Sequence, residues 1–220
     1  MGEESNKNQL SVVKNNYLAK VSSTLSITNK LLKEIDNRQP SDDFRVPIPD
    51  VNFQKYLSEE LGIDVSKGTV NYGDVKNVSE IKCPNRKIES LEEIEYFIGL
   101  ISLICNSNQL TSLYIKKNKT LKVLNCSFNK LKKIDLTKNV ALIRFDCSLN
   151  DLSDLDVSKN TSLIKFDCSL NHLSDLDVSK NTSLIKFDCF SNKLTYLDIT
   201  KNKALTELNY TDNPIIEIKR

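Results

Sequence analysis

Hydrophobic and polar positions alternate in a short stretch that returns many times along the second half of the chain. In LIRFDCSLNDLSDLDVSKNTS, residues 142–162, Phe145 and Cys147 are interleaved with the polar residues Arg144, Asp146 and Ser148. A period of two is typical of a strand with one buried face, so the apolar pair is predicted to point inward and the polar residues outward. The other apolar positions complete the predicted inward set: Leu142, Leu152, Leu155 and Val157.

This stretch is one of about seven copies, and their period of about 21 residues is typical of a solenoid. The copies occupy 100–120, 121–141, 142–162, 163–183, 184–204 and the shortened 205–220, and a degenerate first copy begins at Val78. In a solenoid, stacked coils bury a core that no single repeat could bury alone. The predicted fold is an α/β repeat solenoid, right-handed, with a parallel β-sheet on its concave face.

The six cysteines follow the same period and are predicted to form a buried ladder of reduced thiols. They stand at positions 83, 105, 126, 147, 168 and 189. A disulfide framework or a metal site uses paired or irregular spacings instead. Equivalent side chains of parallel, in-register strands also point the same way, which does not suit the geometry of a disulfide. Metal ligation and other cofactors are not expected.

Two series of asparagines recur once per copy. The first follows each cysteine position by three residues, where the chain turns inward and an amide side chain can satisfy backbone groups that lose water. The second is predicted to mark the other turn of each coil. Both series are expected to be structural: Asn108, Asn129, Asn150, Asn171, Asn192 and Asn213, then Asn118, Asn139, Asn160, Asn181 and Asn202.

The first third of the chain carries no repeat. Apolar residues at helical spacing predict a long helix, or a helical hairpin broken near Ser22–Thr24, over 6–36, and three prolines in 38–49 predict a linker. A second helix is predicted to start after Asp50 and to stop at Gly62, with Phe53, Tyr56, Leu57 and Leu61 on its apolar face. The predicted organisation is therefore 1–46 as an N-terminal helical segment and linker, 47–77 as a helical cap, and 78–220 as the repeat domain.

The last copy departs from the pattern. Tyr210 stands in place of the cysteine, and Pro214 interrupts the copy. We expect this copy to close the solenoid incompletely, whether the chain ends here naturally or continues in a longer protein.

Composition excludes several function classes. With 31 Lys and Arg against 29 Asp and Glu, the formal net charge of +2 argues against a nucleic-acid binder. No apolar run is long enough to span a membrane, and the segment 1–20 has no apolar signal region. The single histidine, His172, lies at a variable surface position, so no catalytic residues are predicted and an enzyme is not expected.

The repeats resemble the leucine-rich repeats of the internalin type in which cysteine takes one core position. The resemblance rests on FDCSLNDLSDLDVSKNTS, on IPDVNFQKYLSEELGI (48–63) and on IESLEEIEYFIGLISL (88–103). It implies a monomeric bacterial protein, extracellular or on the cell surface, that recognises a protein or a glycan of a host cell. Related caps often carry a calcium-binding loop, but DVSKGTVNYGD (64–74) has only two carboxylates, so no metal is predicted there.

The candidate binding residues are the outward positions of the concave sheet. A basic column (Arg144, Lys165, Lys186) is expected beside an acidic column (Asp146, Asp167, Asp188), and an apolar strip (Phe128, Leu149, Leu170, Phe190) beside both.

Other interpretations stay open for the same residues. The charged columns could pair with each other and leave only a solvated face, and the apolar strip could fold over the edge of the coil. The near-identical copies 142–162 and 163–183 favour a spacer that displays other domains, and an effector inside a host cell is a further alternative. A row of identical aspartates lacks the unequal environments that paired catalytic carboxylates need.

Overall fold

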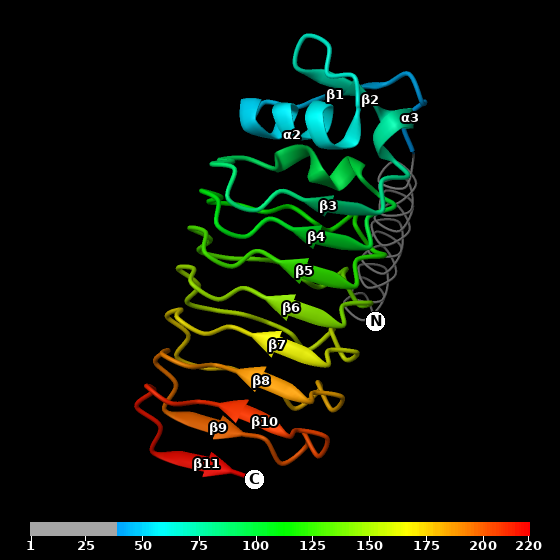
Figure 1. Cartoon of the computed structure of the whole chain (residues 1–220). Coiled ribbons are helices and arrows are strands. Elements are labelled where there is room, and N and C mark those ends of the chain that lie inside the picture. The colour runs from blue at the N-terminus through cyan, green and yellow to red at the C-terminus, as the bar shows by residue number, and fades with distance from the viewer. Residues whose placement is uncertain (1–38) are drawn as a thin grey trace, which may run out of the picture. The chain divides into compact units, whose positions relative to one another are not determined.

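The computed structural model describes residues 39–220, and Ser41–Arg220 forms one compact unit. The helix or hairpin expected over 6–36 lies outside the described residues. The unit is a solenoid whose main sheet has seven parallel strands (Figure 1). In spatial order these are β10 (Glu207–Asn209), β8 (Lys186–Asp188), β7 (Lys165–Asp167), β6 (Arg144–Asp146), β5 (Val123–Asn125), β4 (Ser102–Ile104) and β3 (Glu80–Lys82).

The strands pair in register, so each repeat position forms a column. Phe145 is paired with Phe166, and Phe166 with Phe187, and their buried rings stack with centroids 5.6 and 5.4 Å apart. All six cysteines are free and buried, as predicted. Because burial disfavours the thiolate, the pKa of the Cys83 and Cys189 thiols is raised to about 12.

The first asparagine series joins neighbouring coils, as predicted. Asn150 Nδ2 donates to the carbonyl of Cys126 in the preceding coil at 3.0 Å and to that of Cys147 in its own coil at 3.1 Å. Its Oδ1 accepts the backbone N–H of Leu131 at 2.9 Å. The same contacts recur in successive copies, so one amide satisfies backbone groups from two coils at the inward turn.

The second asparagine series lies at the opposite turn and is more deeply buried. Asn160 Nδ2 donates to the carbonyl of Asn139, its equivalent in the preceding coil, at 2.9 Å. The side-chain oxygens of this series are buried without a hydrogen-bond partner, whereas those of the first series accept a backbone N–H. The two ladders therefore stabilise the coil unequally, although the sequence repeats them with equal regularity.

Helix α2 (Val51–Leu61) lies over the first coil (Figure 1). Asp50 caps it as predicted: Oδ1 accepts from the backbone N–H groups of Asn52 and Phe53, and Oδ2 accepts from those of Glu89 and Ser90 in the first coil. The helix ends at Gly62, whose φ of 64° suits glycine, and it buries Phe53, Tyr56 and Leu57.

The other elements near α2 include one that the sequence did not reveal. Strand β1 (Arg45–Pro47) pairs antiparallel with β2 (Thr69–Asn71), so the linker expected over 38–49 is wrong for these three residues. The short helix α3 (Tyr72–Val75) follows β2, and the 3₁₀ helix η1 (Glu92–Tyr96) completes the first coil. Together with α2, these elements cover the core at this end of the solenoid, as a cap does.

At the other end, the chain keeps the repeat geometry further than its pattern suggests. Asn213 still donates to the carbonyls of Cys189 and Tyr210, so Pro214 does not interrupt the ladder. Beyond it, β11 (Glu217–Lys219) pairs with β9 (Tyr196–Asp198) in a separate two-stranded parallel sheet. The apolar residues of this last coil are only partly buried, so closure is incomplete, as expected.

Candidate binding face

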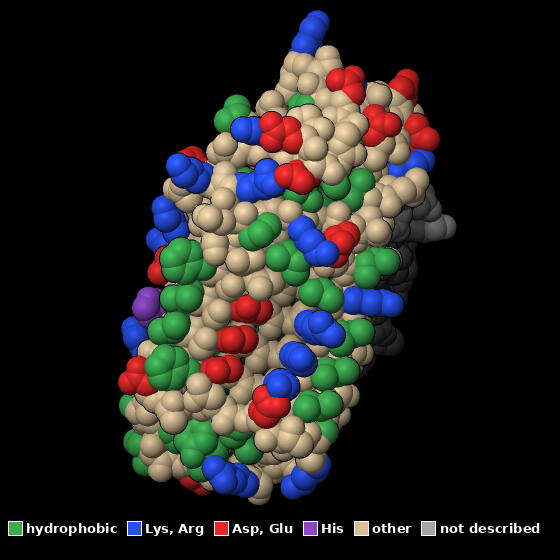
Figure 2. Space-filling model, viewed as in Figure 1, with side chains coloured by type: hydrophobic (Ala, Val, Ile, Leu, Met, Phe, Trp, Pro, Cys, Tyr) green, Lys and Arg blue, Asp and Glu red, His purple; other side chains and the backbone are tan. Residues whose placement is uncertain are grey.

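The outward positions of the main sheet form a shallow groove. It has a volume of about 430 Å³, and residues of β4, β5, β6, β7, β8 and β10 line it. The exposed face in Figure 2 shows a row of acidic side chains beside a row of basic ones, with hydrophobic side chains gathered along both edges. The predicted basic column (Arg144, Lys165, Lys186) and acidic column (Asp146, Asp167, Asp188) both line this groove.

Each aspartate of the acidic column is held in the same way. Its Oδ1 accepts the backbone N–H of the residue two positions later, at 3.0 Å in Asp146, 2.9 Å in Asp167 and 2.9 Å in Asp188. For the first two, the acceptor also receives a serine hydroxyl. Each carboxylate therefore keeps its orientation because the turn after the strand uses one of its oxygens.

The middle aspartate bears an electrostatic penalty. Burial raises the pKa of Asp167, and the neighbouring carboxylates of Asp146 and Asp188 raise it further, against the lowering effect of the hydrogen bonds from Ser169. The cause is the register: in-register parallel strands stack like charges at a spacing of about 4.8 Å.

The two charged columns do not pair with each other. Within residues 39–220, no ion pair joins a member of the basic column to a member of the acidic column; instead Lys186 Nζ lies 2.5 Å from Glu207 Oε1 on the next strand of the sheet. The alternative in which the two charged columns compensate by pairing with each other is therefore wrong. Arg144 and Lys165 have no ion-pair partner in the described part of the chain, which leaves both signs of charge available in the groove.

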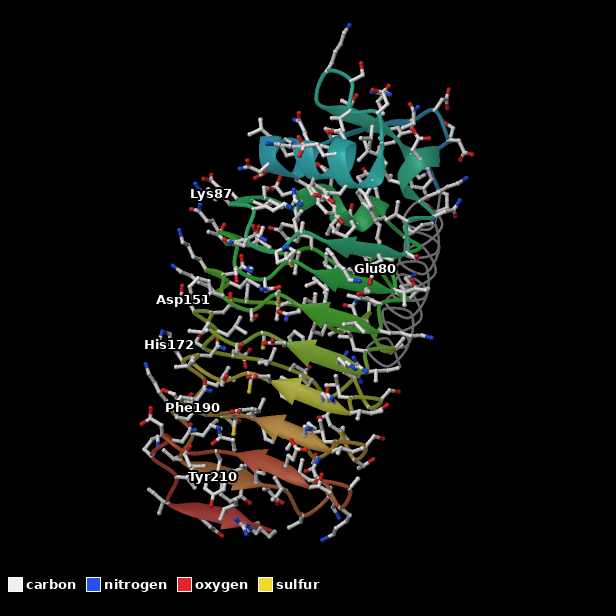
Figure 3. All side chains as sticks on the ribbon, viewed as in Figure 1. Glu80, Lys87, Asp151, His172, Phe190 and Tyr210 are labelled. Carbon is white, nitrogen blue, oxygen red and sulfur yellow. The ribbon has the colours of Figure 1, made fainter. Side chains whose placement is uncertain are left out.

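The apolar strip is mostly exposed. Phe128, Leu149 and Leu170 keep 58%, 42% and 40% of their surface accessible, whereas Phe190 is half-buried. The alternative of a strip folded over the coil edge is wrong for the first three and right for Phe190. In Figure 3, Asp151, His172 and Phe190 mark the edge of the coils along which this strip runs.

Several residues of the groove were not among the predicted site residues. Asn125 and Asn209 continue the acidic column with neutral side chains, and Glu207 continues the basic column with the opposite charge. One full repeat onward from Lys186 leads to Glu207, so the period of the sequence carries the signal for this residue. Ile104 and Val123 line the groove towards β4.

The convex side carries a second set of aspartates with a structural role. Asp156 Oδ1 accepts the backbone N–H of Ser158, and hydrogen bonds from Ser158 lower the pKa of Asp156. His172 is an exposed surface residue, as predicted. In the described range, no three His, Cys, Asp or Glu side chains are close enough together to hold a metal ion. No helix among residues 39–220 is long and apolar enough to cross a membrane.

Solved structures share this architecture. A leucine-rich repeat protein of Leptospira interrogans matches with a TM-score of 0.61 and 23% identity over 66% of this chain. Internalin C2 of Listeria monocytogenes matches with a TM-score of 0.58 and 20% identity, over 81% of this chain and 92% of its own. The leucine-rich repeat domain of APL1B matches with a TM-score of 0.59 and 22% identity over 66% of this chain. The fold is a leucine-rich repeat solenoid.

These similarities concern the fold. The chain spans 40% of the Leptospira structure and 45% of the APL1B structure. A scan of protein-family models finds no match, and a search of curated protein sequences finds none either.

Proposed function

We propose that this leucine-rich repeat protein recognises another protein through the concave groove. The observation that supports the proposal is the absence of pairing between the two charged columns in the described part of the chain. Apart from Lys186, which pairs with Glu207, the charges of both columns have no ion-pair partner there. Electrostatic complementarity of this kind provides specificity and a faster encounter with a partner. We assign the groove to binding, since the turn after each strand holds Oδ1 of all three aspartates through the backbone N–H two residues later.

Reversing the basic column tests the use of the groove. In the variant Arg144→Glu/Lys165→Glu/Lys186→Glu, the charge of one wall of the groove changes sign. We expect the affinity for a partner captured by the wild-type chain from host-cell surface extract, or for a ligand found on a glycan array, to change, in a direction set by the charge of that partner.

The convex side offers a matched control. Lys138, Lys159 and Lys180 recur at the same period and lie away from the groove, so their triple change to glutamate alters net charge equally. The same change in this control variant would mean that net charge, and not the groove, governs binding. Unchanged binding in the concave variant would contradict the proposal.

A spacer function is the second candidate. It is favoured by copies 142–162 and 163–183, which differ only where Arg144 and Asp151 are replaced by Lys165 and His172. A spacer requires uniform coils, whereas a shaped site usually needs variation between them. A folded wild-type chain that captures no partner would support this candidate.

For location, we propose a bacterial cell surface or a secreted state, with a monomer as the active form. The proposal depends on the resemblance of the repeats and the cap to the internalin type. Labelling of intact and permeabilised source cells with an antibody to this chain tests it: labelling of permeabilised cells alone would contradict a surface location. An effector inside host cells is the alternative, and it would be detected by fractionation of exposed host cells.

A further inference from the structure

The apolar strip occupies backbone positions that are unfavourable for large side chains. Phe128, Leu149 and Leu170 have φ of 53°, 54° and 55°, in the left-handed region that most residues other than glycine and asparagine avoid. The equivalent residues of flanking coils also have positive φ, but they are small or polar: Asn85, Ser107, Ser191 and Asp212. The central coils therefore place exposed apolar side chains where the fold itself needs only a turn residue. A partner that packs on them would bury this surface.

The acidic column runs beside the strip and has unused hydrogen-bonding capacity. In the described part of the chain, Oδ2 of Asp188 accepts from Asn209 Nδ2 at 3.1 Å, but no donor contacts Oδ2 of Asp146 or Asp167. Within residues 39–220, the basic column forms no ion pair with these carboxylates. A cationic group of a partner would supply the missing counter-charge to carboxylates that are already partly desolvated.

The two features recur together at the spacing of the coils. Leu149 follows Asp146 by three residues, and Leu170 follows Asp167 in the same way. Neighbouring coils are about 4.8 Å apart, close to the helix pitch of about 5.4 Å. An amphipathic helix laid along the solenoid would thus meet a new coil with each turn. Arg144 and Lys165 lie on the far side of the aspartates and would repel a uniformly basic segment.

We propose that the partner surface recognised by this groove is a basic amphipathic helix, whose lysine or arginine side chains bind the acidic column while its apolar side chains pack on the strip of Phe128, Leu149 and Leu170. This inference rests on the proposed function, since it names the partner chemistry of the same groove. It commits to the acidic side of the groove, because three successive coils expose a large apolar side chain there, whereas Ile143 and Ile164 beside the basic column are half-buried.

The chain itself supplies conservative variants for the test. Asn125 occupies the acidic column in the coil before Asp146, and its Oδ1 accepts the backbone N–H and hydroxyl of Ser127 as Asp146 does from Ser148. The triple variant Asp146→Asn/Asp167→Asn/Asp188→Asn therefore removes charge and keeps the turn.

Serine is likewise native at the position of the strip. Ser107 and Ser191 have φ of 57° and 50°, so the variant Phe128→Ser/Leu149→Ser/Leu170→Ser keeps the backbone conformation. The convex variant Asp156→Asn/Asp177→Asn/Asp198→Asn is the control for lost negative charge, since it removes three carboxylates on the opposite side.

The probes are three synthetic helical peptides: an amphipathic Lys/Leu peptide, the same peptide with glutamate for lysine, and a Lys/Leu peptide of scrambled order. Titration against the full-length chain by isothermal calorimetry should show binding of the first peptide. Each exposed ion pair is worth a factor of about two to five in affinity, so the aspartate variant should bind more weakly by about tenfold. The strip variant should also bind more weakly, and the convex control should not change.

Other results would overturn the inference in distinguishable ways. Equal binding of the scrambled peptide, or stronger binding of the glutamate peptide, would reject a basic amphipathic partner and leave concave recognition intact. No binding by any peptide, together with a natural partner whose affinity still changes in the basic-column variant, would lead to the same conclusion.

Two further probes address occupants from this chain. Residues 6–33 carry five lysines and no acidic residue, so binding of a peptide with that sequence in place of the Lys/Leu peptide would assign the groove to this chain and reject a separate partner. A doubled mass in light scattering that the aspartate variant abolishes would assign it to a second copy.

Discussion

Removal of one ladder asparagine tests how the solenoid is held together. Asn150→Ala deletes an amide whose Nδ2 donates to the carbonyls of Cys126, Cys147 and Ser148 and whose Oδ1 accepts from Leu131. The two Nδ2 protons are shared among three carbonyls, so the amide makes the equivalent of three hydrogen bonds at about 1 kcal/mol net each, and the groups left behind lie at a buried turn that water reaches poorly. We expect the free energy of unfolding to fall by about 3 kcal/mol.

The second ladder provides an internal comparison. Asn160→Ala removes the same atoms, so the cavity left by the side chain is similar. Its Nδ2 donates to two carbonyls, at 2.9 and 3.3 Å, but its Oδ1 is buried without a partner. Because deletion of an unsatisfied oxygen recovers about 1 kcal/mol or more, we expect a net loss of only about 1 kcal/mol for this variant.

Urea unfolding followed by far-UV circular dichroism measures both variants. The comparison is valid where the dependence of unfolding free energy on urea keeps the same slope, which also shows that the coils still unfold together. Asp151→Ala, an exposed neighbour, should leave stability unchanged. The reasoning fails if Asn160→Ala destabilises as much as Asn150→Ala, or if Asn150→Ala costs less than about 1 kcal/mol.

Three shorter predictions follow from other contacts. Asp167→Asn should stabilise the protein at pH 7, because the raised pKa of Asp167 in the folded state shows that folding disfavours its ionised form. As the pH falls from this raised pKa towards the unfolded value of about 3.9, Asp167 becomes protonated and the stability gained by the variant should shrink. A gain that grows in acid would contradict this reasoning. Asp50→Ala should lower the unfolding free energy by about 2 kcal/mol, because it removes the cap of α2 and the acceptor for the backbone N–H groups of Glu89 and Ser90. Urea unfolding measures this change, and Asp50→Asn should lower the unfolding free energy by less. The six cysteines should resist a thiol reagent in the native state and react fully in urea, as counted by mass spectrometry, since burial raises their pKa; fast labelling of the native chain would refute the buried ladder.

Much of the fold follows from the sequence because a solenoid is a local structure. Each coil contacts mainly its neighbours, so the pattern within one repeat determines which side chains point inward and which turns need an amide. The buried positions of Phe145, Cys147 and Asn150 were predicted for this reason, and so was the helix between Asp50 and Gly62, whose boundaries depend on adjacent residues. The outward direction of the charged columns follows from the same alternation.

Features that depend on contacts outside this pattern needed the tertiary structure. The pairing of β1 with β2 joins segments on either side of helix α2 through backbone groups, which leave no periodic signal in side chains. The partners of the charged side chains were also undetermined, since Lys186 pairs with Glu207 across strands and, within residues 39–220, the aspartates of the acidic column receive no lysine.

The exposure of the apolar strip was decided in the same way. Leucine at a turn position is compatible with burial or with solvent, and the structure leaves Leu149 and Leu170, both at positive φ, exposed. The sequence by itself thus determined the repeating coil, because its causes lie within one repeat and its neighbours. The tertiary structure decided which charges and apolar surfaces remain free to bind, because that depends on how side chains of different coils meet in space.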